Sequence, residues 1–207
     1  MKDEKEIGRG RPSQDLDQRL LTVARAILER DGLEALTLRA AARAAGVSHM
    51  APYRHYASKD ELLAAVATHG FHTLTHEMDD ATAKRADQAG QLECLGISYV
   101  LFAMRNPALY RLMFGANLPN RARFPGLVEA GNAALHRCQR IVKGETGASE
   151  KPVGCEPEPA AVAIWSLVHG LASLAIDGLI KLPEADSASL KKEVQTVLRA
   201  AFAVQKA

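Results

Sequence analysis

Apolar residues recur at helical spacing along most of this chain. Near the N-terminus they step by three, four or one positions, which places them on one face of a helix: Leu16, Leu20, Val23, Ala24, Ile27 and Leu28. This helix should begin at Asp15 or Asp17 and end at Gly32. β-branched and aromatic residues nowhere alternate with polar ones, as they would in half-buried strands. The pattern predicts an all-α protein of about nine helices.

The stretch TLRAAARAAGVSHMAPYRHYASK, residues 37–59, predicts two short helices about a tight turn. Thr37 can cap the first helix with its hydroxyl, and Gly46 follows where a helix end favours a residue that tolerates positive φ. Ser48 is expected to cap a second helix of about two turns. Pro52 falls in the first turn of that helix, where it should disturb the backbone little. Such a pair forms a helix-turn-helix, whose second helix can enter the DNA major groove.

A longer helix and five others should follow this stretch. Ser58 and Glu61 form a capping box that opens a helix reaching about residue 82, and residues 87–90 form a break. The remaining helices are expected at residues 91–104, 108–116, 125–143 and 160–182, and from residue 187 or 189 onwards. The segment 160–182 is apolar nearly all round and is expected to be covered on more than one side. The chain should therefore divide into an N-terminal arm (1–13), a three-helix head (14–75) and a helical body (76–207).

Composition and charge limit the function classes. The net charge of +2 is too small to make the whole molecule a polycation. The polar first residues argue against a secretory signal, and no segment has the uninterrupted apolar length of a membrane span. Three widely spaced cysteines, Cys94, Cys138 and Cys155, fit a reducing cytoplasm better than disulfides or a zinc ribbon. The sequence lacks a Gly-rich phosphate loop, a G-x-S-x-G elbow and paired carboxylates on a plausible cleft, so we expect neither an enzyme nor a cofactor.

The N-terminal arm contains the sequence GRGRP at residues 8–12. An extended Arg-Gly-Arg segment can lie in the narrow minor groove of A·T-rich DNA, which makes Arg9 and Arg11 candidate DNA contacts. A flexible solubilising tail is an equally weighted alternative, because one short basic segment is a compositional signal.

The chain resembles the TetR family of bacterial transcriptional regulators over about residues 15–75. The resemblance rests on Thr-Leu-Arg at 37–39, Ala-Gly-Val-Ser at 45–48, Tyr-Arg-His-Tyr at 53–56 and Ser-Lys-Asp-Glu-Leu at 58–62. Residues 106–115 and the Trp-Ser-Leu-Val-His-Gly segment at 165–170 are similar to the TetR subgroup named for a Trp-His-Gly signature. The resemblance implies a homodimer that binds a partly palindromic operator, usually as a repressor. It also implies that a small molecule bound in the body re-spaces the two heads and releases the DNA.

The resemblance also indicates which residues would contact DNA. Those candidates are Thr37, Arg39, Ser48, His49, Met50, Ala51, Tyr53, His55 and Lys59, together with Arg9 and Arg11 of the arm. His49, Met50 and Ala51 would meet base edges. Phosphates would be held by Thr37, Arg39, Tyr53, His55 and Lys59, and Ser48 would cap the second helix. For Tyr53 we favour DNA contact, whereas for Tyr56 we favour a place in the core of the head.

Two further groups of residues are candidates for small-molecule binding. An apolar pocket is expected to contain Phe71, Tyr99, Phe102, Met113, Phe114, Trp165 and His169, although core packing is an alternative for most of them. His69, His72 and His76 lie on one stripe of a helix and raise a weaker hypothesis of metal binding, because that stripe should be solvated. A redox role for Cys94 or Cys138 is weaker still, since neither cysteine has an evident basic neighbour.

The most apolar segment, 160–182, and the last helix are expected to form the dimer surface as a four-helix arrangement. We therefore expect a cytoplasmic, nucleoid-associated homodimer that binds an operator and an unidentified small-molecule effector, and no membrane. A ligand-independent activator or architectural DNA-binding protein is the alternative.

Overall fold

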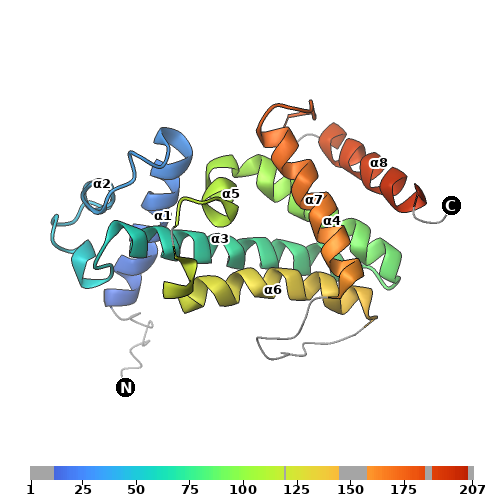
Figure 1. The fold of residues 1–207 in the computed structure, drawn as a ribbon. Helices are drawn as coiled ribbons and strands as arrows, with labels where there is room; N and C mark the ends of the chain where they lie inside the picture. The colour runs from blue at the N-terminus through green and yellow to red at the C-terminus, as the bar shows by residue number, and fades with distance from the viewer. Residues whose placement is uncertain (1–11, 119, 145–157, 185–187, 205–207) are drawn as a thin grey trace, which may run out of the picture. The chain divides into compact units, whose positions relative to one another are not determined.

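The computed structural model describes residues 12–118, 120–144, 158–184 and 188–204, and these residues form helices and no strand (Figure 1). The α-helices are α1 (Pro12–Asp31), α2 (Leu38–Ala44), α3 (Lys59–Thr82), α4 (Gln88–Arg105), α5 (Pro107–Phe114), α6 (Pro125–Val142), α7 (Pro159–Ile176) and α8 (Ala188–Val204). Two short 3-10 helices, η1 (Pro52–Arg54) and η2 (Arg121–Arg123), complete the described elements. The all-α prediction is confirmed, but the described residues form eight α-helices rather than about nine.

The missing α-helix is the second helix of the predicted helix-turn-helix. Residues 48–55 form successive i to i+3 turns instead, in which the carbonyls of Ser48, Ala51 and Pro52 accept from Ala51, Arg54 and His55. An α-helix capped at Ser48 would need the N–H of Pro52 for its first i to i+4 bond, and proline has no N–H. Pro52 therefore changes the local structure more than the sequence predicted.

The chain divides into two compact units, one ending at Val66 and the other beginning at Ala67. The first unit is built from α1, α2, η1 and the first residues of α3. The apolar face predicted for the first helix is buried there, with Leu20, Ala24, Ile27 and Leu28 all in the core. The helix itself begins at Pro12, earlier than predicted, because proline fits the first helical position, where no N–H partner is needed.

The turn after α2 is a Schellman motif, as the position of Gly46 predicted. Gly46 has φ +67°, its N–H donates to the Arg43 carbonyl, and the N–H of Val47 donates to the Ala42 carbonyl. At the other end of α2, the Thr37 hydroxyl accepts from the N–H of Ala40 at 3.0 Å. Both ends of this seven-residue helix are therefore satisfied by local contacts.

Replacing Gly46 by alanine should lower the free energy of unfolding by about 1–2 kcal/mol, because an L-residue is strained in the left-handed region. A Cβ added at Gly46 meets no atom within 4 Å, so strain alone sets the effect. Gly126→Ala is the matched control, since that glycine also has free space around its Cβ position, lacks a positive φ and lies in α6. Urea denaturation of both variants measures the difference, and equal stability of the two would contradict the assignment.

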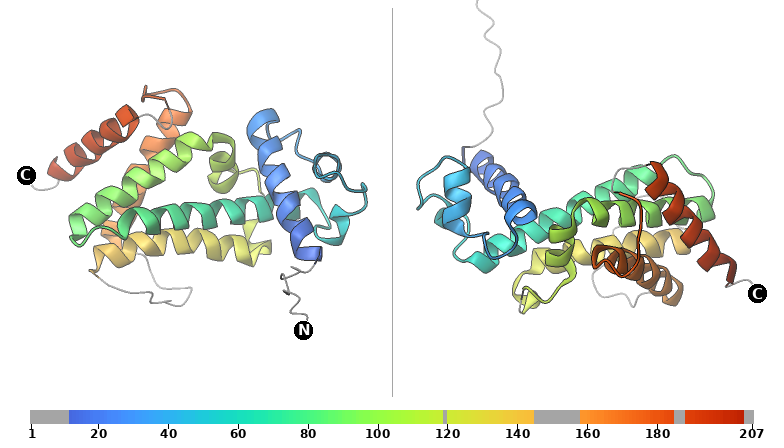
Figure 2. Two further views of the ribbon diagram at one scale, coloured as in Figure 1. Left: turned by 180° about the vertical axis from the view of Figure 1, so that it is seen from behind. Right: turned by 90° about the horizontal axis from the view of Figure 1, so that it is seen from above.

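The second unit holds the larger core. Helix α4 packs against α6, α7 and α8, and α7 also packs against α6 (Figures 1 and 2). Most of the second half of α4 is buried, including Tyr99, Val100, Phe102 and Ala103. Helix α4 begins at Gln88 rather than at residue 91, because the Asp87 carboxylate caps it by accepting from the N–H of Gly90 at 2.7 Å. The predicted break at residues 87–90 is thus a helix start.

Helix α7 ends at Ile176, earlier than the predicted end at residue 182. Gly178 has φ +71°, and the N–H of Leu179 donates to the Leu174 carbonyl, which is another Schellman ending. A left-handed glycine therefore ends this helix before Pro183 is reached. Helix α7 is the one described helix that is long and apolar enough to cross a membrane, although this is weak evidence of a span. Only 28% of its apolar window is buried within the chain.

Candidate functional site

The first unit exposes most of the side chains that the sequence singled out around α2 and η1. Thr37, Arg39, Ser48, His49, Met50 and Tyr53 are all exposed. Met50 is 57% exposed and Tyr53 is 42% exposed, so both side chains are available to a partner. These residues lie on α2, on the turn that follows it and on η1. The short elements therefore present a mixed apolar and polar surface to solvent.

Three other candidates lie partly buried in the same unit. Ala51 is half-buried, and His55 Nδ1 lies 3.7 Å from Asp17 Oδ1. The Lys59 ammonium donates to the carbonyl of Leu33 at 3.1 Å. His55 and Lys59 thus contact the interior of their own unit, and both also reach its surface.

Long-range polar contacts hold these elements together. Arg19 of α1 donates to the carbonyl of Ala45 at 2.6 Å, which ties α1 to the end of α2. The Tyr56 hydroxyl donates to Asp17 Oδ1 at 2.5 Å. Burial, with the neighbouring Asp17 carboxylate, raises the pKa of Tyr56 well above its ordinary value, so the phenol stays protonated. The expectation that Tyr56 belongs to the core of this unit is confirmed, since the residue is buried.

Two exposed arginines were not among the predicted contacts. Arg43 lies one turn after Arg39 on α2, and Arg54 follows Tyr53 in η1. The described residues provide no ion pair to either guanidinium. Both arginines lie beside predicted DNA contacts in the sequence, and this position could have identified them as further candidates. Arg9 and Arg11 of the predicted arm lie outside the described residues.

The second unit contains a cluster of five rings on α4, α5 and α7: Tyr99, Tyr110, Phe114, Trp165 and His169. Tyr99 meets Trp165 edge to face at 4.9 Å between ring centroids, and Phe114 meets His169 in the same way at 4.9 Å. The hydroxyls of Tyr99 and Tyr110 lie 2.8 and 2.7 Å from His169 Nδ1 and 3.2 Å from each other. If one of the two hydroxyls donates to the single lone pair of Nδ1, the ring proton of neutral His169 lies on Nε2.

Some of the predicted pocket residues lie in the core of the second unit, and others line a cavity. Phe71, Tyr99, Phe102 and Met113 are buried in the core, and Trp165 is partly buried against Tyr99 and Phe114. Only Phe114 and His169 of the predicted set line an open cavity of about 300 Å³ between α5 and α7. The cavity also has polar walls that the sequence did not reveal, formed by Tyr110, Arg111, Asn117, Ser173 and Asp177. Arg111 donates to Asp177 Oδ1 at 2.8 Å and to the Ile176 carbonyl at 3.0 Å.

Burial lowers the pKa of His169 below its ordinary value of 6.5, so the folded protein favours the neutral imidazole. The unfolded chain binds a proton at His169 at higher pH than the folded chain does. Stability should therefore fall as pH drops below about 6.5, until the lower folded pKa is reached, with a slope of at most about 1.4 kcal/mol per pH unit. Urea denaturation at several pH values, compared between the wild type and His169→Gln, measures this. An identical pH dependence in both proteins would contradict the prediction.

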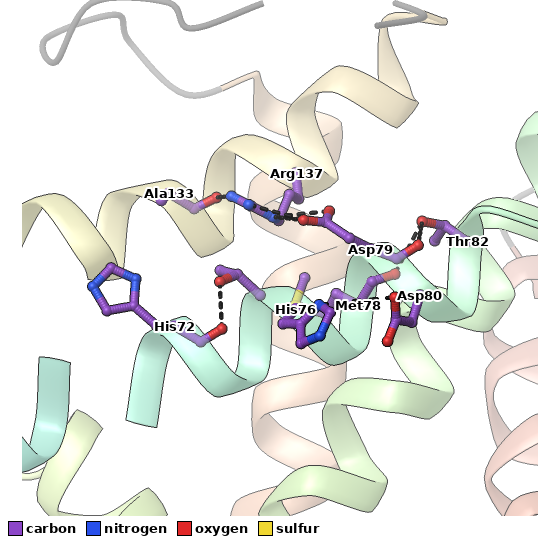
Figure 3. Close-up of polar contacts among 9 residues, drawn as sticks. His72, His76, Met78, Asp79, Asp80, Thr82, Ala133 and Arg137 are labelled. Carbon is purple, nitrogen blue, oxygen red and sulfur yellow. Dashed lines mark hydrogen bonds and ion pairs between the residues drawn. The ribbon is translucent and has the colours of Figure 1, made fainter. Parts of the chain in front are cut away.

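The three histidines of the predicted stripe, His69, His72 and His76, lie exposed on α3, and Figure 3 shows two of them, His72 and His76. His76 Nδ1 is 3.8 Å from Asp80 Oδ1. The Asp79 carboxylate accepts from Nε and Nη2 of Arg137 on α6, at 3.0 and 2.9 Å. Within the described ranges, no group of three or more histidine, cysteine, aspartate or glutamate side chains has the arrangement of a metal site.

Two family models match this chain. "Bacterial regulatory proteins, tetR family" matches residues 20–66, which contain α2, η1 and the exposed residues between them. "Tetracyclin repressor-like, C-terminal domain" matches residues 92–197, about half of the 207-residue chain. The Trp-His-Gly subgroup is not named by either match.

Relatives agree with these matches. The HTH-type transcriptional regulator Rv1816 of Mycobacterium tuberculosis is 27% identical over 116 residues, which is 55% of this chain and 50% of that protein. The nucleoid occlusion factor SlmA of Actinobacillus pleuropneumoniae is 29% identical over 99 residues, covering 47% and 49%. The matched part thus spans about half the length of these curated relatives.

Solved structures share the fold over nearly the whole chain. A protein of unknown function from Rhodococcus sp. RHA1 is 30% identical, with a TM-score of 0.70 and coverage of 96% and 97%. FadR from Bacillus subtilis, solved in complex with stearoyl-CoA, is 14% identical, with a TM-score of 0.67 and coverage of 88% and 95%, and shows the fold alone. With a regulator-type N-terminal unit, a matching C-terminal domain and a shared fold, this chain belongs to the TetR family of bacterial DNA-binding transcriptional regulators.

Proposed function

We propose that this protein is a ligand-responsive repressor that binds a palindromic operator as a homodimer. The observation that carries the proposal is the exposed surface of α2 and η1, on which large apolar and cationic side chains lie together in solvent. Met50 and Tyr53 have no role in the core of their unit, and Arg39, Arg43 and Arg54 add positive charge beside them. Such a surface suits a DNA groove, because its cations meet phosphates and its apolar side chains meet thymine methyl groups.

In the proposed complex, His49, Met50 and Ala51 contact base edges. The sugar-phosphate backbone of the DNA is contacted by Thr37, Arg39, Ser48, Tyr53, His55 and Lys59. The minor groove is reached by Arg9 and Arg11. The structural observations support the exposed members of this set most strongly. For Lys59, DNA contact would need the ammonium to share or leave its bond to the Leu33 carbonyl.

The proposed dimer uses α7 and α8. Val162 and Leu174 of α7 are 40% and 42% exposed, although the sequence of this helix is strongly apolar. A second copy would cover this surface, and burial of apolar area contributes about 25 cal/mol per Å². Two copies are also what a palindromic site requires. A regulator of this kind acts on DNA in the cytoplasm.

The proposed effector site is the cavity between α5 and α7. Its volume of about 300 Å³ suits a small organic molecule, and Phe114, His169 and Arg111 supply an apolar wall, an N–H donor and a cation. Nε2 of His169 is the ring nitrogen that remains for a ligand, since the hydroxyls of Tyr99 and Tyr110 both lie within hydrogen-bonding distance of Nδ1. His169, which lines this cavity, belongs to the Trp-His-Gly segment, whose assignment to a TetR subgroup stays a prediction.

Selection of bound sequences from a random duplex pool by the full chain tests the DNA-binding part. We expect a palindromic consensus with half-sites about one helical turn apart or slightly more. Sedimentation equilibrium should give a dimer at the same protein concentration. Retention of no sequence above the random background would refute an operator-binding function.

The ligand-responsive part is tested by a thermal-shift screen followed by operator release. A compound that raises the melting temperature binds the folded protein, and it should also lower operator affinity. His169→Gln should weaken that compound while leaving operator binding without ligand unchanged. Operator binding that no stabilising compound alters would favour the ligand-independent alternative.

A further inference from the structure

The largely exposed segment that contains the candidate base contacts, residues 48–55, has little regular hydrogen bonding of its own. In this reading segment, the carbonyls of Ser48, Ala51 and Pro52 accept from N–H groups three residues later, at 3.0, 3.2 and 2.9 Å. Bonds of this 3-10 type have poorer geometry than those of an α-helix, and runs of them are short. The shape of the reading segment therefore depends on contacts from other parts of the N-terminal unit.

Two side chains of α1 hold the reading segment, one beyond each of its ends. Arg19 donates to the carbonyl of Ala45 at 2.6 Å, just before the segment. Asp17 accepts from the hydroxyl of Tyr56 at 2.5 Å, just after the segment. These two contacts join residues that are 26 and 39 positions apart in the chain. Helix α1 thus fixes both ends of a segment that its own backbone bonds hold only weakly.

The bond between Tyr56 and Asp17 is partly buried and involves a carboxylate. Tyr56 is 6% exposed, and hydrogen bonds to a carboxylate are roughly twice as strong as those between neutral groups. Asp17 Oδ1 also lies 3.7 Å from Nδ1 of His55, the last residue of the reading segment. One carboxylate of α1 therefore faces both residues at which the reading segment ends.

The charge of Asp17 separates positioning from direct DNA contact. A carboxylate on a DNA-binding unit repels phosphates, so its removal alone should strengthen the sequence-independent part of binding or leave it unchanged. Any loss of operator affinity on removal of Asp17 must therefore arise through the residues that Asp17 holds in place.

We propose that Asp17 is a specificity-determining positioning residue, which holds Tyr56 and thereby places His49 and Met50 of the reading segment against the bases of the operator. Arg19 supports the same segment at its start. Binding groups must be held to within about 0.5 Å of their productive positions, whereas attraction to phosphates carries no sequence information. A reading segment without this anchor would still bind DNA but would discriminate less between sequences. This role rests on the proposed operator binding.

The test compares Asp17→Ala with Asp17→Asn in the full-length protein, using the selected operator and a random duplex of the same length at one salt concentration. Both variants remove the same charge, but asparagine keeps a side-chain oxygen that can accept from Tyr56. Asp17→Ala should lower the ratio of operator affinity to random-duplex affinity at least about tenfold, because the anchor is lost in both subunits. Asp17→Asn should keep this ratio within about threefold of the wild type. The two variants should bind the random duplex equally.

Tyr56→Phe removes the same hydrogen bond from the other side, with no change of charge and little change of volume. It should lower the ratio about as much as Asp17→Ala does. The double variant should lose at most about twofold more than either single variant, because both substitutions remove one shared bond. Tyr56→Phe keeps the proposal testable even where Asp17→Ala fails to fold.

Equal losses for the operator and the random duplex would overturn the proposal, as would a loss for Asp17→Asn as large as for Asp17→Ala, or additive losses in the double variant. Amide hydrogen exchange without DNA gives a separate measurement. Exchange in residues 48–56 should be at least about fivefold faster in Asp17→Ala than in Asp17→Asn, with no difference in α4. Equal exchange in the two variants would also contradict the anchor. Failure to select any operator would refute the proposed function, whereas the exchange comparison still decides whether Asp17 fixes the reading segment.

Discussion

Replacing Tyr53 by alanine should weaken operator binding about 30-fold or more and leave the dimer intact. Tyr53 is 42% exposed on η1, so its removal costs the folded unit little packing. A hydrogen bond to a charged group such as a phosphate contributes about 1.5–3 kcal/mol, and a homodimer loses it twice, which gives about 3–6 kcal/mol in total. Fluorescence anisotropy with the selected operator measures the affinity, and sedimentation measures the dimer.

Matched variants identify the kind of contact. Tyr53→Phe keeps the ring and removes the hydroxyl, so a loss close to that of alanine would assign the effect to a phosphate hydrogen bond. Arg39→Ala should also reduce the salt dependence of binding, by about 0.9 in log–log slope for each phosphate contact. Tyr53→Ala should leave that slope unchanged because tyrosine carries no charge. Dissociation of the dimer by Tyr53→Ala, or unchanged affinity, would refute the DNA-contact assignment.

Replacing Phe102 by alanine should lower the free energy of unfolding by about 3–5 kcal/mol, the range for removing a buried aromatic ring. Phe102 is fully buried on α4, where that helix packs against other helices of the second unit. Val128→Ala on α6 is the control and should cost less than about 1 kcal/mol, because Val128 is 38% exposed. Urea denaturation at one fixed protein concentration measures both, since a dimer is concentration-dependent.

The same experiment separates core residues from cavity residues. Phe114 lines the cavity between α5 and α7, so Phe114→Ala should change the affinity of an effector found in the thermal-shift screen. Phe102 has no surface in that cavity, so its effect should be confined to stability. A small loss of stability for Phe102→Ala, combined with altered effector affinity, would indicate that Phe102 lies in the effector pocket, as the sequence predicted.

Local features of the fold were predictable where a residue acts on its own neighbours in the chain. The Ser58 hydroxyl accepts from the N–H of Glu61 at 3.2 Å, as predicted, and the Glu61 carboxylate accepts from the N–H of Ala57, one residue before the expected donor. Thr37 and Gly46 act over three to five residues in the same way. The wrong predictions also had local causes. Pro52 and Gly178 each change the backbone hydrogen bonds around them, and hydrophobic periodicity does not reveal such changes.

The candidate sites were predictable only in part, because helical periodicity places a residue on a face but does not show what that face meets. Phe102 and Phe114 were both predicted as pocket residues, and the packing of other helices decided that one lies in the core and the other beside a cavity. Arg85, which precedes α4, interacts electrostatically with Cys94, and the sequence did not reveal this basic neighbour.

By itself, the sequence determined that this protein is all-helical and that it resembles the TetR family. It also predicted a helix-turn-helix near the N-terminus, which is a DNA-binding motif. These properties follow from caps, turns and apolar spacing, which act over a few residues. Only the tertiary structure decided which side chains stay in solvent and which line the cavity between α5 and α7. It also decided that the hydroxyls of Tyr99 and Tyr110 converge on His169. Contacts between helices set these features, and their free energy depends on side chains far apart in the chain.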